Sequence, residues 1–263
     1  MEIIINPPNS SVFLNLFGYN LRYYGLILSS AIFIGCILCY QLFLKLKSKE
    51  EADFFIDYIP IIAIIGIVGA RIFYVIGNLD FYLKNKTEIL MINHGGLSVW
   101  GAIIFGAISL YLYLKFKKRD IMLHFDFISF ALPLCQAIGR FGNYFNQEAF
   151  GRPSDFFIKL YVDKAFRPEE FAGYNYFHPT FLYESILDLL IFLVLIFLLK
   201  NKNKLKQGTI FYSYIGLYSI ARIFVEYIRI DSVAYVFHIP VAGFISFIML
   251  TASLICLKRL YIK

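Results

Sequence analysis

The sequence predicts an all-α, polytopic membrane protein with seven transmembrane helices and a small extracytoplasmic head. The first observation is composition: the 263 residues are 59% hydrophobic and only 16% charged, whereas soluble domains contain about a quarter charged residues. The second is the set of seven apolar stretches, each near the ~20 residues that a helix needs to cross a bilayer. They are residues 23–44, 54–78, 96–114, 125–146, 180–199, 208–229 and 240–257.

Basic residues orient these spans. Lysine-rich clusters follow the first, third, fifth and seventh spans, at residues 45–49, 115–119, 200–206 and 258–263. Positively charged loops remain in the cytoplasm, so the N-terminus is expected outside and the C-terminus inside. The net charge of +7 is then explained by topology, and no nucleic-acid partner is expected.

The segments outside the spans complete the order of elements. Residues 1–22 lack the basic region of a cleaved signal peptide, so the first span is expected to direct insertion. The outer connections are residues 79–94, 147–178 and 230–239. Residues 147–178 are rich in Phe, Tyr, Pro and charge, and long structured loops often carry function. Together with residues 1–22 they are expected to form the head of a single membrane domain covering residues 1–263.

The cysteines do not indicate a disulfide framework or a metal site. Cys36, Cys39, Cys135 and Cys256 all fall within apolar spans, where packing is their ordinary role. Neither a metal nor another cofactor is expected.

Arginines lie in spans, where charge is costly. Arg71, Arg140 and Arg222 fall in the outer halves of spans two, four and six, and Arg229 ends span six. Each arginine alone can reach the interface with its head group. However, three helices carry guanidinium groups at a similar depth in the membrane, and this convergence predicts an anion site. Intramembrane charges usually face the interior of the helix bundle, and guanidinium groups pair with phosphate. Glu226 can face both Arg222 and Arg229, so one of these two has the alternative role of neutralising it.

Further polar residues fall at the same predicted level. Arg140, Asn143 and Gln147 fall on one helical face if the helix continues that far, and Asn146 extends this face. Span five opens with "HPTFLYE", in which His178 is either an interfacial cap or a catalytic group. Tyr183 and Glu184 lie about one turn further along this span, and Asp188 lies one turn beyond Glu184. Tyr24, at the start of span one, has an aromatic-belt role as its simplest explanation.

These motifs together resemble the bacterial prolipoprotein diacylglyceryl transferases. "GRFGNYFNQEAFGRP" (139–153) is similar to the family signature G-R-x-G-N-F-x-N-x-E-x-x-G. "YYG" (23–25), "GARIFYV" (69–75), "HPTFLYE" (178–184) and "ARIFVEYIR" (221–229) resemble further family motifs in the same order. The resemblance covers the whole chain.

The resemblance implies a reaction and a location. The family transfers the sn-1,2-diacylglyceryl group of phosphatidylglycerol to the lipobox cysteine thiol of a prolipoprotein signal peptide, and glycerol 1-phosphate leaves. The implied location is the bacterial cytoplasmic (inner) membrane, and the implied partners are phosphatidylglycerol, the prolipoprotein and membrane lipid. The reaction fits the arginines, which can stabilise charge on a departing phosphate, and a thiol that reacts best as thiolate.

The resemblance also implies roles for individual residues. Arg140 is the main phosphatidylglycerol contact and Arg222 the second catalytic arginine, and His178 and Tyr24 complete the catalytic set, with Tyr24 near the entry. The implied substrate-binding residues are Arg140, Asn143, Asn146, Glu148, Gly151, Tyr218, Glu226 and Arg229.

One position departs from the family pattern. Trp100, in "GGLSVWGA", stands where the family has a histidine that is considered a proton acceptor. Tryptophan only donates hydrogen bonds. Either the histidine is dispensable, or His178 or His94 replaces it, or the activity is altered. The alternative functions are therefore a non-catalytic phosphatidylglycerol-binding relative and, because arginines also line anion pathways, an anion transporter.

Overall fold

The computed structural model describes residues 2–8, 10–16, 18–92, 95–201, 205–230, 235–236 and 239–262. The chain divides into two compact units. The first contains residues 1–39 and 125–263, and the second contains residues 40–124.

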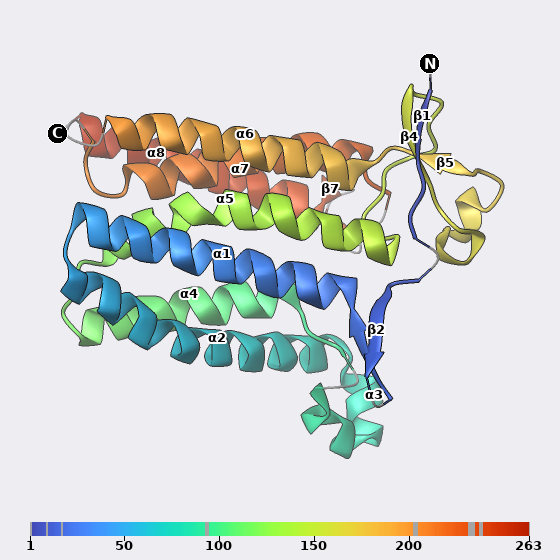
Figure 1. The fold of residues 1–263 in the computed structure, drawn as a ribbon, viewed down its shortest axis with the longest axis horizontal. Helices are drawn as coiled ribbons and strands as arrows, with labels where there is room; N and C mark the ends of the chain where they lie inside the picture. The colour runs from blue at the N-terminus through green and yellow to red at the C-terminus, as the bar shows by residue number, and fades with distance from the viewer. Residues whose placement is uncertain are drawn as a thin grey trace. The chain divides into compact units, whose positions relative to one another are not determined.

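Long helices make up most of both units. The first unit contains most of α1 (Tyr23–Leu46) and α5 (Ile121–Asn146), together with α6 (Thr180–Lys200), α7 (Thr209–Ile228) and α8 (Val241–Tyr261). In it, α7 packs against both α6 and α8 (Figure 1). In the second unit, α2 (Lys49–Gly77) packs against α4 (Val99–Phe116), and the short helices α3 (Leu79–Lys84) and η1 (Lys86–Leu90) follow α2.

The prediction of a polytopic helical membrane protein is confirmed. Each of the seven predicted spans is a helix, and among the described residues six helices are long and apolar enough to cross a membrane. The exception is α7, whose tyrosines, serines, Arg222 and Glu226 lower its hydropathy. Seven crossings therefore stay a prediction.

Several helices begin at different residues from those predicted. α2 begins at Lys49 instead of 54, because the Ser48 hydroxyl accepts a hydrogen bond from the Glu51 amide (3.2 Å) and caps the helix. α5 begins at Ile121 instead of 125, because Asp120 accepts from the Leu123 amide (3.1 Å). The charged first turn of α2 concealed its start in a reading based on hydropathy, whereas α5 begins directly after the charged residues 117–120.

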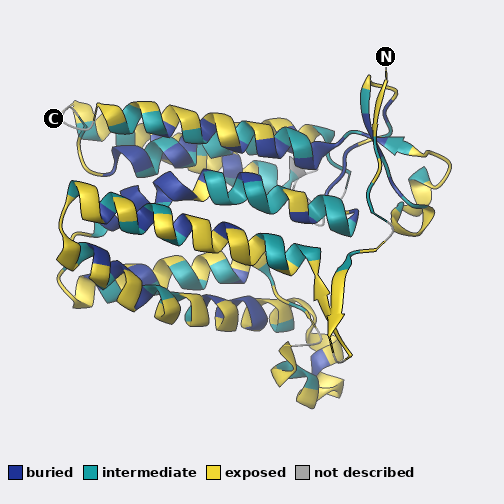
Figure 2. Ribbon diagram, in the orientation of Figure 1, coloured by how far each residue is buried: buried dark blue, intermediate teal, exposed yellow. Residues whose placement is uncertain are grey.

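α5 is the central helix of its unit. In the most apolar 18-residue stretch of α5, 50% of the residues are buried, whereas in that of α8 only 11% are buried (Figure 2). Free thiols join it to α1: Cys39 donates to the Phe127 carbonyl and Cys135 to the Ala31 carbonyl. On its other side, the Ser185 hydroxyl of α6 donates to the Ala137 carbonyl (2.9 Å).

Short strands, which the sequence analysis did not predict, build the head. β1 (Ile3–Ile5) pairs in parallel with β4 (Ile158–Tyr161), and β4 pairs antiparallel with β5 (Tyr176–Phe177). β2 (Val12–Leu16) and β3 (Tyr19–Arg22) form a hairpin that leads into α1. The helices η3 (Lys164–Phe166) and η4 (Glu169–Phe171) lie between β4 and β5, and β6 (Tyr235–Val236) pairs with β7 (Ile239–Pro240).

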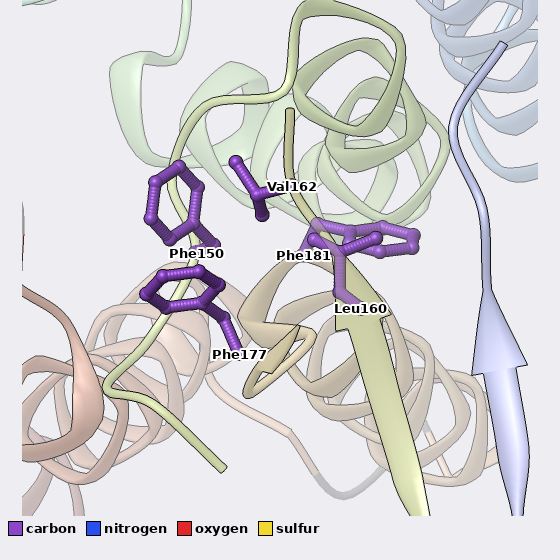
Figure 3. Close-up of a cluster of buried hydrophobic side chains, with 5 residues drawn as sticks. All are labelled: Phe150, Leu160, Val162, Phe177 and Phe181. Carbon is purple, nitrogen blue, oxygen red and sulfur yellow. The ribbon is translucent and has the colours of Figure 1, made fainter. Parts of the chain in front are cut away.

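A small apolar core joins this sheet to the transmembrane helices. Its members come from the loop after α5, from the sheet region and from the first turn of α6; they are Phe150, Leu160, Val162, Phe177 and Phe181 (Figure 3). The Phe150 and Phe177 rings pack with centroids 4.9 Å apart. The core therefore fixes the start of α6 relative to the residues that follow α5. That the head lies outside the membrane stays a prediction.

Gly142 allows a close approach between α5 and α1. A Cβ atom there would lie 2.6 Å from the Tyr24 ring, whereas a Cβ at Gly139, one turn earlier, would meet nothing within 4 Å.

We therefore expect Gly142→Ala to lower stability and Gly139→Ala to leave it unchanged or raise it slightly. The first substitution forces the Tyr24 ring to move, at a cost of about 1–3 kcal/mol. The second gains about 0.5–1 kcal/mol of helix propensity without a clash. Thermal unfolding of both variants in the same detergent measures the difference, and equal melting temperatures would contradict it.

Candidate active site

Three arginine side chains meet one carboxylate where α5 and α7 end and α6 begins. Glu184 Oε2 lies 2.6 Å from Nη2 of Arg140 and 3.2 Å from Nη1 of Arg222, and its Oε1 lies 3.1 Å from Nη1 of Arg229. The Glu184 side chain is 3% exposed and the three arginine side chains are 15–19% exposed. Glu184 is thus the point where the charges of α5, α6 and α7 converge.

Two further carboxylates complete this arginine cluster. Glu226 Oε2 lies 2.5 Å from Nη2 of Arg222, one turn away on α7. Asp188, one turn beyond Glu184 on α6, places Oδ2 3.7 Å from Nε of Arg140. This distance is slightly too long for a hydrogen bond. Asp188 Oδ2 and Arg140 Nε are therefore both buried without a hydrogen-bond partner.

A layer of polar side chains supports the cluster one turn away along α5 and α7. The Tyr218 hydroxyl accepts a hydrogen bond from Nη2 of Arg140 (3.4 Å), and the Tyr218 ring stacks on Tyr214. The buried Tyr214 hydroxyl donates to Oε1 of Gln136 (3.0 Å), which lies one turn before Arg140 on α5. These contacts fix the separation of α5 and α7 at the level of the arginines.

The cluster encloses very little space. A cavity of about 10 Å³ between α6 and α7 is lined by Glu184, Leu187, Asp188, Tyr218, Ala221, Arg222 and Val225. A volume of this size holds about one water molecule. The guanidinium groups are therefore packed on the protein's own carboxylates.

A second polar group forms at the turn after α5. Glu148 Oε1 accepts hydrogen bonds from Nδ2 of Asn143 (2.9 Å) and of Asn146 (3.3 Å). The flanking Gln147 and Ala149 have positive φ angles of 51° and 57°, a left-handed conformation that costs a non-glycine residue about 1–2 kcal/mol. This conformation reverses the chain, so that the Glu148 carboxylate faces the two asparagines behind it.

The side chain of Gln147 belongs to the head. It donates to Oδ2 of Asp163 (2.7 Å) and accepts from the Asp163 amide (2.8 Å). This pair places the turn against the sheet. Gln147 was expected on the polar face of α5 only if the helix continued, and this condition is not met: α5 ends at Asn146, and the left-handed residue turns the side chain away.

Gly151 and His178 are neighbours through their backbones. The Gly151 amide donates to the His178 carbonyl (2.9 Å), and Gly151 also forms an isolated bridge with Arg229. A Cβ at Gly151 would lie 2.8 Å from Cβ of His178. Nδ1 of His178 lies 3.2 Å from the Tyr183 hydroxyl, and burial lowers the pKa of the imidazole, which favours a neutral ring that can accept a proton.

Arg71 has a role that the sequence analysis did not foresee. It belongs to the second unit, and its guanidinium donates to five backbone carbonyls, those of Glu88, Ile89, Met91, Gly95 and Gly96. These bonds hold the connection between η1 and α4. Arg71 therefore has a structural role within the second unit.

The structure brings together most of the predicted site residues that lie in the first unit. Arg140, Tyr218, Arg222, Glu226 and Arg229 share the cluster around Glu184, and Asn143, Asn146 and Glu148 bond to one another. Tyr24 lies against Gly142, one residue before Asn143.

Sequence reasoning assigned no role to Glu184 and Asp188, although it noticed both. The available signal was two carboxylates four residues apart in an otherwise apolar helix, a costly arrangement unless both face cations. Trp100, in the second unit, is 44% exposed, and His94 lies outside the described residues.

Comparisons with known proteins agree on one family. A family model described as prolipoprotein diacylglyceryl transferase matches residues 11–259. Proteins called phosphatidylglycerol–prolipoprotein diacylglyceryl transferase are similar: that of Trichormus variabilis is 38% identical over 92% of this chain and 86% of its own length. The protein of Synechocystis is 39% identical over 82% of this chain and 77% of its own length. The protein of Clostridium botulinum strain Langeland is 38% identical over 89% of this chain and 90% of its own length.

We expect Arg71→Lys to loosen the segment around residues 86–92. Lysine keeps the charge but cannot donate to five carbonyls in a planar arrangement, and carbonyls that lose a charged donor cost about 2 kcal/mol or more together. Limited proteolysis should cut this segment faster in the variant than in wild type or in the exposed control Lys84→Ala. Unchanged proteolysis would contradict the structural role of Arg71.

Proposed function

The chain belongs to the prolipoprotein diacylglyceryl transferase family, and we propose that its arginine cluster carries out this family's reaction. The enzyme transfers the diacylglyceryl group of phosphatidylglycerol to the cysteine thiol of a prolipoprotein lipobox, and glycerol 1-phosphate leaves. This thioether formation is the first step of lipoprotein maturation. The observation that carries the proposal is the meeting of Arg140, Arg222 and Arg229 at one buried point between three helices.

Arg140 and Arg222 bind the phosphate of the lipid. Their planar guanidinium groups suit the oxygens of a phosphodiester. The charge on this phosphate increases when the bond to the diacylglyceryl carbon breaks, so the arginines stabilise the transition state more than the bound lipid. Tyr218 supports Arg140, and Glu226 supports Arg222.

The turn after α5 orients the rest of the head group. Asn143, Asn146 and Glu148 present amide and carboxylate groups that match the hydroxyls of the glycerol in phosphatidylglycerol. Gly151 lets the chain pass close to His178 and Thr180, and Tyr24 lines the entry beside Gly142. His178 stays a candidate proton acceptor next to Tyr183.

The location follows the same reasoning. The lysine-rich connections at residues 45–49, 115–119 and 200–206 face the cytoplasm, which places the N-terminus and the head outside the bacterial inner membrane. The arginine cluster then lies at the outer-leaflet level, where a prolipoprotein presents its lipobox.

We expect wild-type protein in lipid nanodiscs to convert labelled phosphatidylglycerol and a lipobox peptide into thioether peptide and equimolar glycerol 1-phosphate. Arg140→Lys and Arg222→Lys should each reduce this rate by about 10²–10³, the usual loss when a charge-stabilising donor is removed, because lysine keeps the charge but not the planar pair of donors.

Arg259→Lys is the matched control, since this arginine is exposed in the last turn of α8, and it should retain full activity. Absence of both products from wild type that binds the lipid would overturn the proposal and favour the non-catalytic relative. Full activity of both lysine variants would remove the arginines from the reaction.

Trp100 provides a separate prediction. We expect Trp100→His to leave the transfer rate unchanged, because tryptophan is a donor only and the proposed reaction takes its proton acceptor from another residue. Trp100→Phe, which removes the donor and adds no acceptor, is the control. A rate that rises in the histidine variant alone would show that a missing base limits this enzyme.

A further inference from the structure

Among the described residues, the charges of the arginine cluster balance before a lipid enters. Its three guanidinium groups face three carboxylates, those of Glu184, Asp188 and Glu226. A phosphodiester would make the buried site negative by one charge, and the departing phosphate monoester would make it negative by two. Uncompensated charge is expensive in a buried site, so the site needs a proton as the reaction proceeds.

Glu184 occupies the position that the phosphate requires. Its two oxygens accept from Arg140, Arg222 and Arg229, and the adjoining cavity of about 10 Å³ has room for about one water molecule but not for a phosphate group. A phosphate therefore has to replace Glu184 on at least two of these guanidinium groups. A carboxylate that has lost its cations binds a proton more readily.

We propose that Glu184 accepts the proton of the lipobox thiol after the lipid phosphate has displaced it from Arg140 and Arg222. This inference rests on the proposed transferase function and names its proton acceptor, Glu184 in place of His178, whose Nδ1 lies beside the Tyr183 hydroxyl. The thiol S–H bond breaks and its proton passes to the Glu184 carboxylate. The sulfur electron pair forms the bond to the diacylglyceryl carbon, while the bond from that carbon to the phosphate oxygen breaks and its electron pair leaves with glycerol 1-phosphate.

The proton balances the charge of the site. Before transfer, the neutral cluster and the phosphodiester together carry one negative charge. After transfer, protonated Glu184 makes the cluster positive by one, and the phosphate monoester carries two negative charges. The total is unchanged, so the buried site never has to hold an additional charge.

The other acidic groups are less suited to this step. Glu226 is held by Arg222 at 2.5 Å on the same helix. Asp188 lies one turn deeper and faces Nε of Arg140, where both buried atoms lack a hydrogen-bond partner. A small movement that closes this 3.7 Å gap gives Arg140 a new carboxylate when Glu184 leaves, so Asp188 is the positioning residue of the exchange.

The first experiment is Glu184→Gln, which keeps the side-chain volume but accepts no proton and carries no charge. Labelled phosphatidylglycerol should bind as well as or better than to wild type, because the competing carboxylate is gone. Thioether formation should fall by about 10²–10⁴, the usual contribution of a general base. Glu170→Gln, an exposed carboxylate of η4, is the control that should match wild type in both measurements.

A selenocysteine lipobox peptide separates lost proton transfer from lost structure. A selenol is already deprotonated at neutral pH and needs no acceptor. We expect this peptide to reduce the deficit of Glu184→Gln relative to wild type by at least about tenfold. The inference is overturned by an equal deficit with thiol and selenol, by a wild-type rate in Glu184→Gln, or by loss of lipid binding in a folded variant.

Wild-type protein alone gives a second test if the variant does not fold. The groups that face Glu184 from its own and neighbouring elements are Arg140, Asp188, Tyr218, Arg222, Glu226 and Arg229. With the thiol peptide, the rate should fall as pH decreases, because a general base acts only in its unprotonated form; with the selenol peptide this fall should disappear. Equal falls with both peptides would overturn the inference. A wild-type protein without any thioether product would instead refute the transferase function itself.

Discussion

The shared carboxylate of Glu184 is the interaction on which the rest of the site depends. Burying three guanidinium groups is possible only with anions in contact, and removing one partner from such a buried pair typically costs about 3–5 kcal/mol. Because Arg140, Arg222 and Arg229 come from α5 and from the C-terminal end of α7, the Glu184 contacts fix both helices relative to α6. The same ion pairs therefore balance the charges of the site and hold the helices in place.

Further contacts between the same helices hold the arginines at one level along the helix axes. Gln136, one turn before Arg140, and Tyr214, two turns before Arg222, join α5 to α7, and Ser185 joins α6 to α5. At the other end, the apolar core around Phe177 ties the start of α6 to the head. Under the proposal, the phosphate takes the place of Glu184 as the shared anion, and these other contacts hold the helices during the exchange.

The sequence predicted the parts of the fold that depend on local patterns. Hydropathy located all seven helices, since each needs only apolar residues in one continuous stretch. It did not predict β1 pairing with β4, because Ile3 and Ile158 are far apart in the chain and neither strand has a long period-two pattern. The five acceptors of Arg71 are backbone carbonyls, which no pattern of side chains reveals. Motifs identified Arg140 and Arg222, whereas the central position of Glu184 required three helices to be placed together.

An electroneutral resting site also explains how this protein can select a lipid instead of a free anion. Inorganic phosphate can displace Glu184 only through its contacts with the arginines. These arginines already bind a carboxylate, so the exchange gains little free energy. Burial of the two acyl chains does not by itself favour the lipid. A methylene that leaves water contributes about 0.8 kcal/mol, but the chains of a bilayer lipid are already out of water. What distinguishes the lipid is therefore that the bilayer delivers it at high local concentration and fixed orientation. Under the proposal, Glu184 excludes anions that arrive from water and yields to the phosphate that the membrane presents.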